Sequence, residues 1–332
     1  MQAVHLEISG GPLVVRTVRV PIPQEGEVLV KMSAAPVNPS DLHRIRSIEE
    51  ENLTSFIPGI EGSGTVVLAG EGLLPHLWKG RRVACSSVHP ESGTWAEYMV
   101  TSASYCFPLP KAVSDEQGSM LLVNPMTALA FLDMILQEKH KAVINSAASG
   151  SLGGMISYLG KKYGISVINV VRNEQQVSML KESGSEYILN NSDPAFPDQL
   201  KSLSHQLSAT LALDPISGSY TQLLLDAIPY GGTVVLYGNL SAEEQGTNLR
   251  PLLTDNKKLR GFYLGNWMKD NGLLKTVRNL FRVRKLLENE VKINVQNRFP
   301  LEKAQSAVDT YLSNMTAGKV LLVPDSEKSV DA

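Results

Sequence analysis

The sequence has few cysteines, no long apolar run and no block of like charge, and each scarcity excludes a class of protein. Only Cys85 and Cys106 occur among 332 residues, too few for a four-cysteine zinc lobe and evidence against a disulfide framework. No apolar run approaches the roughly 20 residues that a membrane-spanning helix needs. The formal net charge is −2, and the longest like-charge run is Glu49–Glu51. Neither nucleic acid nor a membrane is therefore an expected partner.

The beginning of the chain also lacks a targeting signal. Residues Met1–Val15 have the pattern of a strand and a turn, without the apolar core of a secretory signal or the arginines of a transit peptide. Hydrophobic residues make up 43% of the chain and charged residues 19%, which leaves ample side chains for a core. The length favours two domains of about 150 residues each. The sequence therefore predicts a globular, cytoplasmic protein.

The first third of the chain is rich in short strand patterns. Alternating or β-branched runs are separated by glycine and proline, and no helical periodicity of useful length occurs before about Glu116. These runs are Leu13–Val20, Glu27–Met32, Gly64–Leu68, Arg81–Cys85 and Trp95–Val100. The pattern predicts a compact, irregular β domain.

From Ala142 onwards, predicted strands alternate with helical patterns. The strands are Ala142–Ile144, Val167–Val171, Glu186–Leu189, Thr210–Leu213, Thr233–Tyr237 and Leu259–Leu264. This alternation predicts a doubly wound parallel sheet whose ligand site lies at the carboxyl ends of the strands. After Trp267, helices are predicted at Leu273–Leu287 and Leu301–Ser313, and strands at Lys292–Phe299 and Lys319–Val323. These pieces are too small to fold alone, so we expect them to complete the first domain.

The segment Lys141–Arg172 contains the clearest binding motif. A strand leads into a turn of small residues, and a helical pattern and a second strand follow, which is the order of one βαβ unit. We expect Ala148 and Gly150 to let the backbone turn towards a pyrophosphate, and Gly153 to let the helix pack closely. The predicted cofactor residues of the turn are Ala148, Ser149, Gly150, Ser151, Leu152 and Gly153. The turn alone is equally consistent with a packing role, and its place between strand and helix favours binding.

The end of the second strand of this unit discriminates between cofactors. Enzymes that prefer NAD usually carry an acidic residue there, which accepts a hydrogen bond from the ribose 2′-hydroxyl. This chain carries Arg172, whose guanidinium can bond a 2′-phosphate with two parallel donors. The position therefore predicts NADPH, and a solvated strand-end cation is the alternative.

Several local motifs together resemble the medium-chain dehydrogenase/reductase superfamily. They are Ala35–Asp41, Gly59–Gly64, Lys79–Val83, Gly93–Tyr98, Asn124–Ala128, Ile168–Arg172 and Leu259–Trp267. The last three are similar to the zinc-free branch of quinone oxidoreductases and mitochondrial 2-enoyl thioester reductases. The resemblance implies an α/β fold with a GroES-like β-rich catalytic domain, residues 1–122 and 267–332. It also implies a Rossmann NADPH-binding domain with a doubly wound parallel sheet, residues 123–266.

The resemblance also implies roles for individual residues. The implied substrate-cleft residues are Asn38, Asn124 and Trp267, and the implied further cofactor residues are Thr127, Tyr237 and Gly238. Structural alternatives exist for these positions. Both asparagines precede prolines and fit turns, Thr127 fits a helix cap, and Trp267 fits a buried core position. Asp214 fits the start of a turn, and Glu61 is expected to hold the cleft wall.

Zinc chemistry is disfavoured by the residues themselves. Zinc-dependent relatives carry a histidine at the position of Ile60, which cannot ligate a metal, and the six histidines lack ligand spacing. No metal site is therefore predicted. Without a Lewis acid, the favoured acceptors are already activated, namely quinones or conjugated C=C–C=O systems.

One position departs from the enoyl thioester reductases. They carry a proton-donating tyrosine shortly after the Asn-Pro-Ser-Asp motif, whereas this chain has Glu49 there and no tyrosine between Asp41 and Gly59. Glu49 can act as the acid only where burial raises its pKa. The sequence thus leaves the proton donor open.

The predicted function is zinc-independent, NADPH-dependent hydride transfer to an electrophilic small molecule, either a quinone or a conjugated enone or enoyl acceptor. A 2-enoyl thioester reductase and a non-catalytic NADPH-binding sensor are the alternatives. An exposed edge strand at Leu259–Leu264 favours a homodimer formed by sheet extension, as in relatives.

Overall fold

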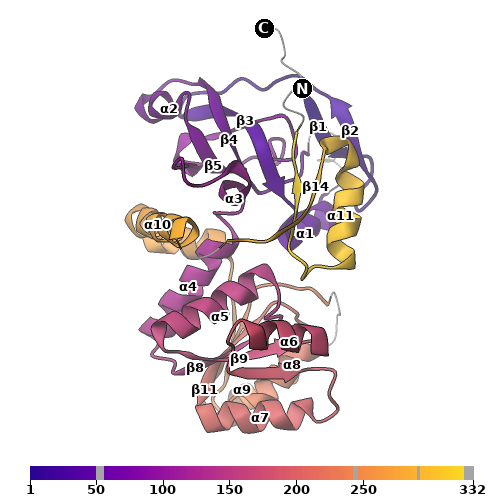
Figure 1. The fold of residues 1–332 in the computed structure, drawn as a ribbon, viewed down its shortest axis with the longest axis vertical. Coiled ribbons are helices and arrows are strands. Elements are labelled where there is room, and N and C mark those ends of the chain that lie inside the picture. The colour runs from indigo at the N-terminus through magenta and orange to yellow at the C-terminus, as the bar shows by residue number, and fades with distance from the viewer. Residues whose placement is uncertain (50–55, 242–245, 290–291, 325–332) are drawn as a thin grey trace. The chain divides into compact units, whose positions relative to one another are not determined.

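The chain divides into two units in the structure, a computed structural model that describes residues 1–49, 56–241, 246–289 and 292–324. Unit 1 consists of Met1–Asn124 and Leu280–Ala332, and unit 2 consists of Pro125–Asn279. Figure 1 labels the elements of both units. Within the described ranges, no helix is long and apolar enough to cross a membrane.

Unit 1 is built mainly from antiparallel strands. A two-stranded sheet pairs β1 (Gln2–Leu6) with β2 (Leu13–Thr17). The larger sheet has the order β14-β15-β3-β4-β5-β7, and β6 also pairs with β3. Its strands are β3 (Glu27–Pro36), β4 (Glu61–Ala69), β5 (Arg82–Ser86), β6 (Tyr98–Ser102), β7 (Cys106–Pro108), β14 (Val295–Phe299) and β15 (Lys319–Leu322). Because β15 pairs with β3, the end of the chain extends a sheet that its beginning starts.

Short helices accompany these strands. They are α1 (Pro39–Ser47), α2 (Leu73–Trp78), η2 (Ala103–Tyr105), α3 (Asp115–Ser119), η3 (Leu301–Lys303) and α11 (Ala304–Ser313). Figure 1 shows α11 beside β14, and its side chains share one apolar core with β15 and α1. The sequence pattern gave no sign of the short helices before Glu116. Helix α1 buries only Asp41, Leu42 and Ile45, so its apolar periodicity is too short to recognise.

Unit 2 contains the predicted doubly wound parallel sheet. Its strand order is β10-β9-β8-β11-β12-β13, so the order reverses between β8 and β11. The strands are β8 (Ala142–Asn145), β9 (Ser166–Val171), β10 (Tyr187–Asn190), β11 (Ala209–Asp214), β12 (Thr233–Leu236) and β13 (Lys258–Gly261). All neighbouring pairs are parallel, which brings the carboxyl ends of the strands to one edge.

Helices cover both faces of this sheet. They are α4 (Asn124–Gln137), α5 (Ser151–Tyr163), α6 (Glu174–Glu182), α7 (Phe196–Leu207), α8 (Ser219–Ala227) and α9 (Arg250–Thr254). Successive strand residues point to opposite faces. Ile144 and Ile168 pack in the core that α7 and α8 complete, whereas Val143 and Val167 face α4 and α5. Strands buried on both faces explain the nearly continuous apolar runs in the sequence.

Helix α10 differs most from its prediction. It runs from Leu264 to Asn289 and is interrupted at Gly272, where φ is 71° and ψ is 169°. The predicted helix from Leu273 is thus only the part after the glycine, and the predicted strand ends at Gly261 instead of Leu264. The domain boundary expected at position 267 falls inside α10, and the division into units follows Asn279. The glycine breaks the helical pattern, which hid the first turns in the sequence.

Candidate functional site

The turn between β8 and α5 presents the start of a helix at the carboxyl edge of the sheet. Ala147 adopts a left-handed backbone with φ of 53°, whereas Gly150 is the N-cap of α5 with φ of −76° and ψ of 167°. Ala147 therefore supplies the left-handed residue, and Ala148 lies in the turn that the Gly150 N–H closes by donating to the Ala147 carbonyl at 3.1 Å. Because the N-cap has no side chain to bond the first turn, the N–H groups at the start of α5 are left for an anionic ligand.

Gly153 holds the first turn of α5 close against the preceding backbone. A Cβ atom added there would lie 2.6 Å from the carbonyl oxygen of Ala147 and 2.7 Å from the Cα atom of Ala148. Real Cβ atoms do not approach backbone that closely, so this contact needs glycine. The next residue, Gly154, has open space around the same position. The close packing expected of Gly153 is thus made against the turn itself.

A buried polar cluster fastens this turn to the sheet. The Asn145 side-chain amide donates to the carbonyl oxygen of Gly153 at 2.9 Å and to Oδ1 of Asn169 at 3.0 Å. The Ser157 hydroxyl donates to the same Asn169 oxygen at 2.6 Å. Sequence reasoning missed these contacts, although two asparagines in apolar strands were a visible signal. The cluster fixes the start of α5 relative to β8 and β9.

Arg172 follows β9 at the same edge of the sheet. Its backbone is held on both sides, since its N–H donates to Gln176 Oε1 at 2.9 Å and its carbonyl accepts from the Ser192 hydroxyl at 2.5 Å. The next residue, Asn173, caps α6 by accepting from the N–H of Gln176. The Arg172 side chain is exposed, so an anchored backbone presents a cation beside the β9 end.

The end of β12 carries Tyr237 and Gly238. The Tyr237 N–H donates to the carbonyl of Asp214 at 3.0 Å, and its ring packs edge-on against Phe131. A Cβ atom on Gly238 would lie 2.7 Å from the Pro215 carbonyl oxygen, so the glycine is needed for packing within the protein. Asp214 accepts from the N–H groups of Ile216 and Ser217 and from the Thr221 hydroxyl. Its carboxylate therefore organises the turn, as the structural alternative predicted.

Three further predicted residues lie on α4 and α10. Asn124 begins α4, and Thr127 is buried one turn into that helix, which removes the helix-cap alternative for Thr127. Trp267 lies in the first turns of α10, with the ammonium of Lys275 5.4 Å from its ring centroid. Asn124 belongs to unit 1, whereas Thr127 and Trp267 belong to unit 2.

In unit 1, Asn38 belongs to a buried charged cluster with Asp41, Glu61 and Lys319, each at most 2% exposed. The Asn38 side-chain amide donates to Glu61 Oε1 at 3.0 Å, and the Lys319 ammonium donates to the Asn38 side-chain oxygen. Asp41 accepts from the N–H groups of Asn38 and Ile60, both at 2.8 Å. Asn38 thus uses both ends of its amide inside the protein. Its substrate-cleft role stays a prediction.

Comparison with known proteins gives the family. The family described as alcohol dehydrogenase GroES-like domain matches residues 24–111, and the family described as zinc-binding dehydrogenase matches residues 151–279. The mitochondrial enoyl-[acyl-carrier-protein] reductase of Dictyostelium discoideum is 30% identical over 74% of this chain and 71% of its own length. The Arabidopsis thaliana protein of that name is 28% identical over 95% of this chain and 85% of its own. The chain belongs to the medium-chain dehydrogenase/reductase superfamily.

Solved structures agree with this assignment. A candidate NADPH:quinone reductase from Mesorhizobium loti has a TM-score of 0.87 at 29% identity, covering 97% of this chain and 94% of that protein. Escherichia coli quinone oxidoreductase, solved with NADPH, has a TM-score of 0.87 at 21% identity, covering 98% and 100%, and this likeness shows the fold. The predicted GroES-like domain and Rossmann-type parallel sheet are confirmed. The chain is an oxidoreductase.

The side chains that could bind a metal ion do not gather at one place in the described part of the chain. Within the described residues, no three histidine, cysteine, aspartate or glutamate side chains gather closely enough to hold an ion. Cys85 and Cys106 are free, buried thiols on neighbouring strands. Burial raises the pKa of Cys106 to about 12 and that of Cys85 well above its ordinary value, so both stay protonated.

Glu49 is the residue that the resemblance matches to the proton-donating tyrosine of enoyl thioester reductases. It lies just after α1 and its side chain is exposed. Glu50 and Glu51 lie outside the described residues. The burial that a glutamic acid needs to protonate a substrate near neutral pH is therefore missing at Glu49.

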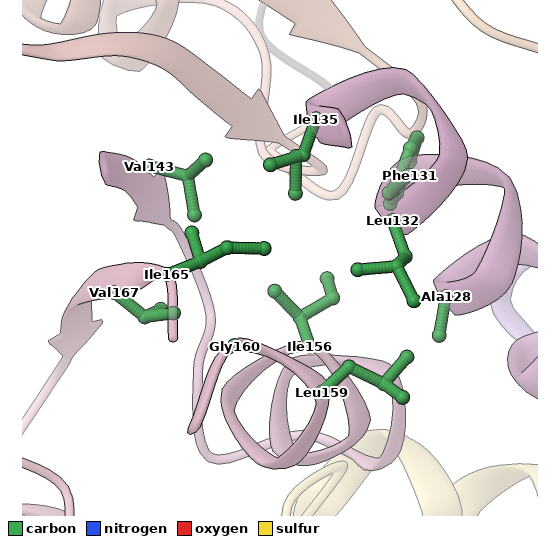
Figure 2. A pocket seen from close by; sticks show the side chains of 10 residues that line it. All are labelled: Ala128, Phe131, Leu132, Ile135, Val143, Ile156, Leu159, Gly160, Ile165 and Val167. Atoms are coloured by element: carbon green, nitrogen blue, oxygen red, sulfur yellow. The ribbon is translucent and has the colours of Figure 1, made fainter. Parts of the chain in front are cut away.

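The core of unit 2 contains a small apolar cavity, shown in Figure 2. Its volume is about 10 Å³, and side chains of α4, β8, α5 and β9 line it, among them Phe131, Val143 and Ile156. This space is barely that of one water molecule, and its lining offers a water no polar partners. The cavity is a packing defect between α4, α5 and the sheet and is too small for a cofactor or a substrate.

Proposed function

We propose that this oxidoreductase transfers hydride from NADPH to a quinone or a conjugated C=C–C=O acceptor without zinc. The observation that carries the proposal is the β8–α5–β9 unit with Arg172 at the end of β9. The N–H groups at the start of α5 suit a pyrophosphate, and the exposed guanidinium suits a 2′-phosphate. A medium-chain reductase fold solved with NADPH supports the same cofactor.

The residues of the turn fit a dinucleotide. The close contact at Gly153 brings the start of α5 against the turn, where a side chain would otherwise push the helix away from the turn backbone. When bound, NADPH supplies the hydride from its nicotinamide C4. In our proposal the chain binds the phosphates through residues 148–153 and Arg172, while Thr127, Tyr237 and Gly238 border the nicotinamide half. Asn124 and Trp267 border the acceptor, and the protein chiefly orients the two reactants.

We infer the class of hydride acceptor from two features of the chain, the residue at the zinc-ligand position and the candidate proton donor. Ile60 stands where zinc-dependent relatives have histidine, so we assign no Lewis acid to polarise an alcohol or simple ketone. The exposed Glu49 is a poor acid for protonating the α-carbon of an enolate. A quinone needs less help, since its reduced oxygens take protons from water. A 2-enoyl thioester reductase remains the second candidate, because the curated relatives carry that name.

The test is NADPH oxidation by the purified protein with three kinds of acceptor. Turnover with quinones or simple enones, and little with enoyl thioesters, is the result we expect. A strong preference for enoyl thioesters would replace the proposed substrate by the second candidate. Tight NADPH binding without turnover of any acceptor would make the protein a cofactor-binding sensor instead.

We further propose that the oxidoreductase is a homodimer joined through β13, the last strand of the unit 2 sheet. The N–H groups of Lys258 and Phe262 donate to carbonyl oxygens at the start and end of β12. Because successive N–H groups of a strand point to opposite sides, the N–H of Gly261 points away from β12. Gly261→Pro removes that outward donor, and a side chain there meets open space. We expect this variant to be monomeric by light scattering while still binding NADPH. A dimer that persists unchanged would refute pairing through β13.

A further inference from the structure

The Glu61 carboxylate, at the start of β4, accepts hydrogen bonds on both of its oxygens. Oε1 accepts from the Asn38 amide at 3.0 Å. Oε2 accepts from the backbone N–H groups of Leu122 at 3.0 Å and Val123 at 2.9 Å. These two residues directly precede Asn124, where α4 begins. One buried carboxylate therefore holds the backbone from which α4 starts.

Three donors on one carboxyl group favour its ionised form. An ionised carboxylate only accepts hydrogen bonds, whereas a protonated one turns one oxygen into a donor. Burial raises the pKa of Glu61, and Lys319 is the strongest influence that lowers it again. Lys319 lies on β15 and is itself buried; burial lowers its pKa, and the carboxylates of Glu61 and Asp41 oppose that fall. Without the ammonium, burial would raise the pKa of Glu61 further and favour its protonated form.

The other titratable groups around this pair are accounted for. Burial raises the pKa of Asp41 to about 7, and two backbone N–H groups oppose the rise. Tyr311 faces Asp41 and Cys85 faces Glu61, and burial raises the pKa of both, so they are neutral near pH 7. Asp41, Glu61 and Lys319 are therefore the ionisable groups of the cluster within the described residues, and Asp41 is partly protonated at pH 7.

We propose that Glu61 and Lys319 are positioning residues for the reaction. Lys319 keeps Glu61 ionised, and the ionised carboxylate fixes Leu122 and Val123 and with them the first turn of α4. This inference rests on the proposed function, in which Asn124 and Thr127 of that turn border the reacting groups. Neither positioning residue touches a reactant, and each acts through the backbone.

Lys319→Met is the principal test. At pH 7 the variant is expected to lose about 10- to 100-fold in kcat, because a displaced first turn misaligns the reactants. NADPH affinity is expected to fall much less than kcat, since the proposed phosphate-binding residues 148–153 and Arg172 do not lie on α4. As the pH rises, Glu61 ionises even without its ammonium, so the ratio of variant to wild-type kcat is expected to recover.

Two further variants separate positioning from folding. Lys257 is also a buried lysine, donating to the Leu225 carbonyl oxygen at 2.7 Å within unit 2, so Lys257→Met is the matched control without a pH-dependent loss of kcat. Glu61→Gln cannot ionise, so its loss of kcat is expected to be independent of pH. Adding Lys319→Met to it is expected to lower kcat by less than about twofold, because the lysine acts through the glutamate.

Amide hydrogen exchange reads the same contacts without any substrate. The N–H groups of Leu122 and Val123 are expected to exchange slowly in the wild type and at least tenfold faster in both Lys319→Met and Glu61→Gln. If the wild type turns over no acceptor, the proposed function fails. Amide exchange at Leu122 and Val123 still tests whether Glu61 and Lys319 hold that backbone. Unchanged exchange at these two amides, or a Lys319→Met pH profile parallel to the wild type, would overturn the inference. Should Lys319→Met not fold, Glu61→Gln decides by the same exchange measurement.

Discussion

Arg172→Ala is expected to weaken NADPH binding by about 100-fold, or about 3 kcal/mol, and to change NADH binding by less than about twofold. The structure presents this guanidinium on a backbone fixed by Gln176 and Ser192, with its side chain exposed at the carboxyl edge of the sheet. A planar cation in that place can bond two oxygens of a 2′-phosphate, which NADH lacks. Titration of each cofactor by nucleotide fluorescence measures the two dissociation constants directly.

Two other variants make the Arg172 experiment specific. Arg172→Lys keeps the charge and loses the paired donors, so an intermediate loss for NADPH is expected. Arg250→Ala removes another exposed arginine of unit 2, at the start of α9, and serves as the control for net charge. Equal losses for NADPH and NADH in Arg172→Ala would remove the 2′-phosphate role. Arg172 would then be a strand-end cation without a ligand.

The Rossmann-type sheet of unit 2 was predictable because its signals are local. The strand, the small-residue turn, the helix and Arg172 lie within one stretch of about 30 residues, the length of one βαβ unit. Alternation of strands and helices then specified the parallel sheet. The left-handed backbone of Ala147 was not predicted, because an alanine in that conformation has no recognisable signature, and Gly150 itself has an ordinary extended backbone.

The charged cluster of unit 1 was not predictable in the same way. Lys319 stands at the start of a predicted strand, where lysine is ordinarily exposed, and its partner Asn38 lies 281 positions away. Only the pairing of β15 with β3 brings the two together. Glu61 was expected to hold the wall of a cleft. Its contacts with Leu122 and Val123 join residues 61 and 62 positions apart, so a local sequence pattern cannot predict them.

Gly153→Ala is expected to destabilise the protein by about 3 kcal/mol or more and to weaken NADPH binding at least about 100-fold. The new methyl group would meet the Ala147 carbonyl oxygen at 2.6 Å and the Ala148 Cα at 2.7 Å. These neighbours are backbone atoms, and a side-chain rotation cannot relieve the contact. The first turn of α5 must move away from the bend, and the N–H groups that face the phosphates move with it.

Gly154→Ala is the matched control for this substitution. It places the same methyl group on the next residue of the same helix, where nothing lies within 4 Å. We expect a gain of up to about 1 kcal/mol from the higher helix propensity of alanine, with NADPH affinity unchanged. Chemical denaturation and cofactor titration of the two variants compare only the position of one methyl group. Equal behaviour would show that close packing of α5 on the turn does not govern cofactor binding, leaving Gly153 as one small residue among several.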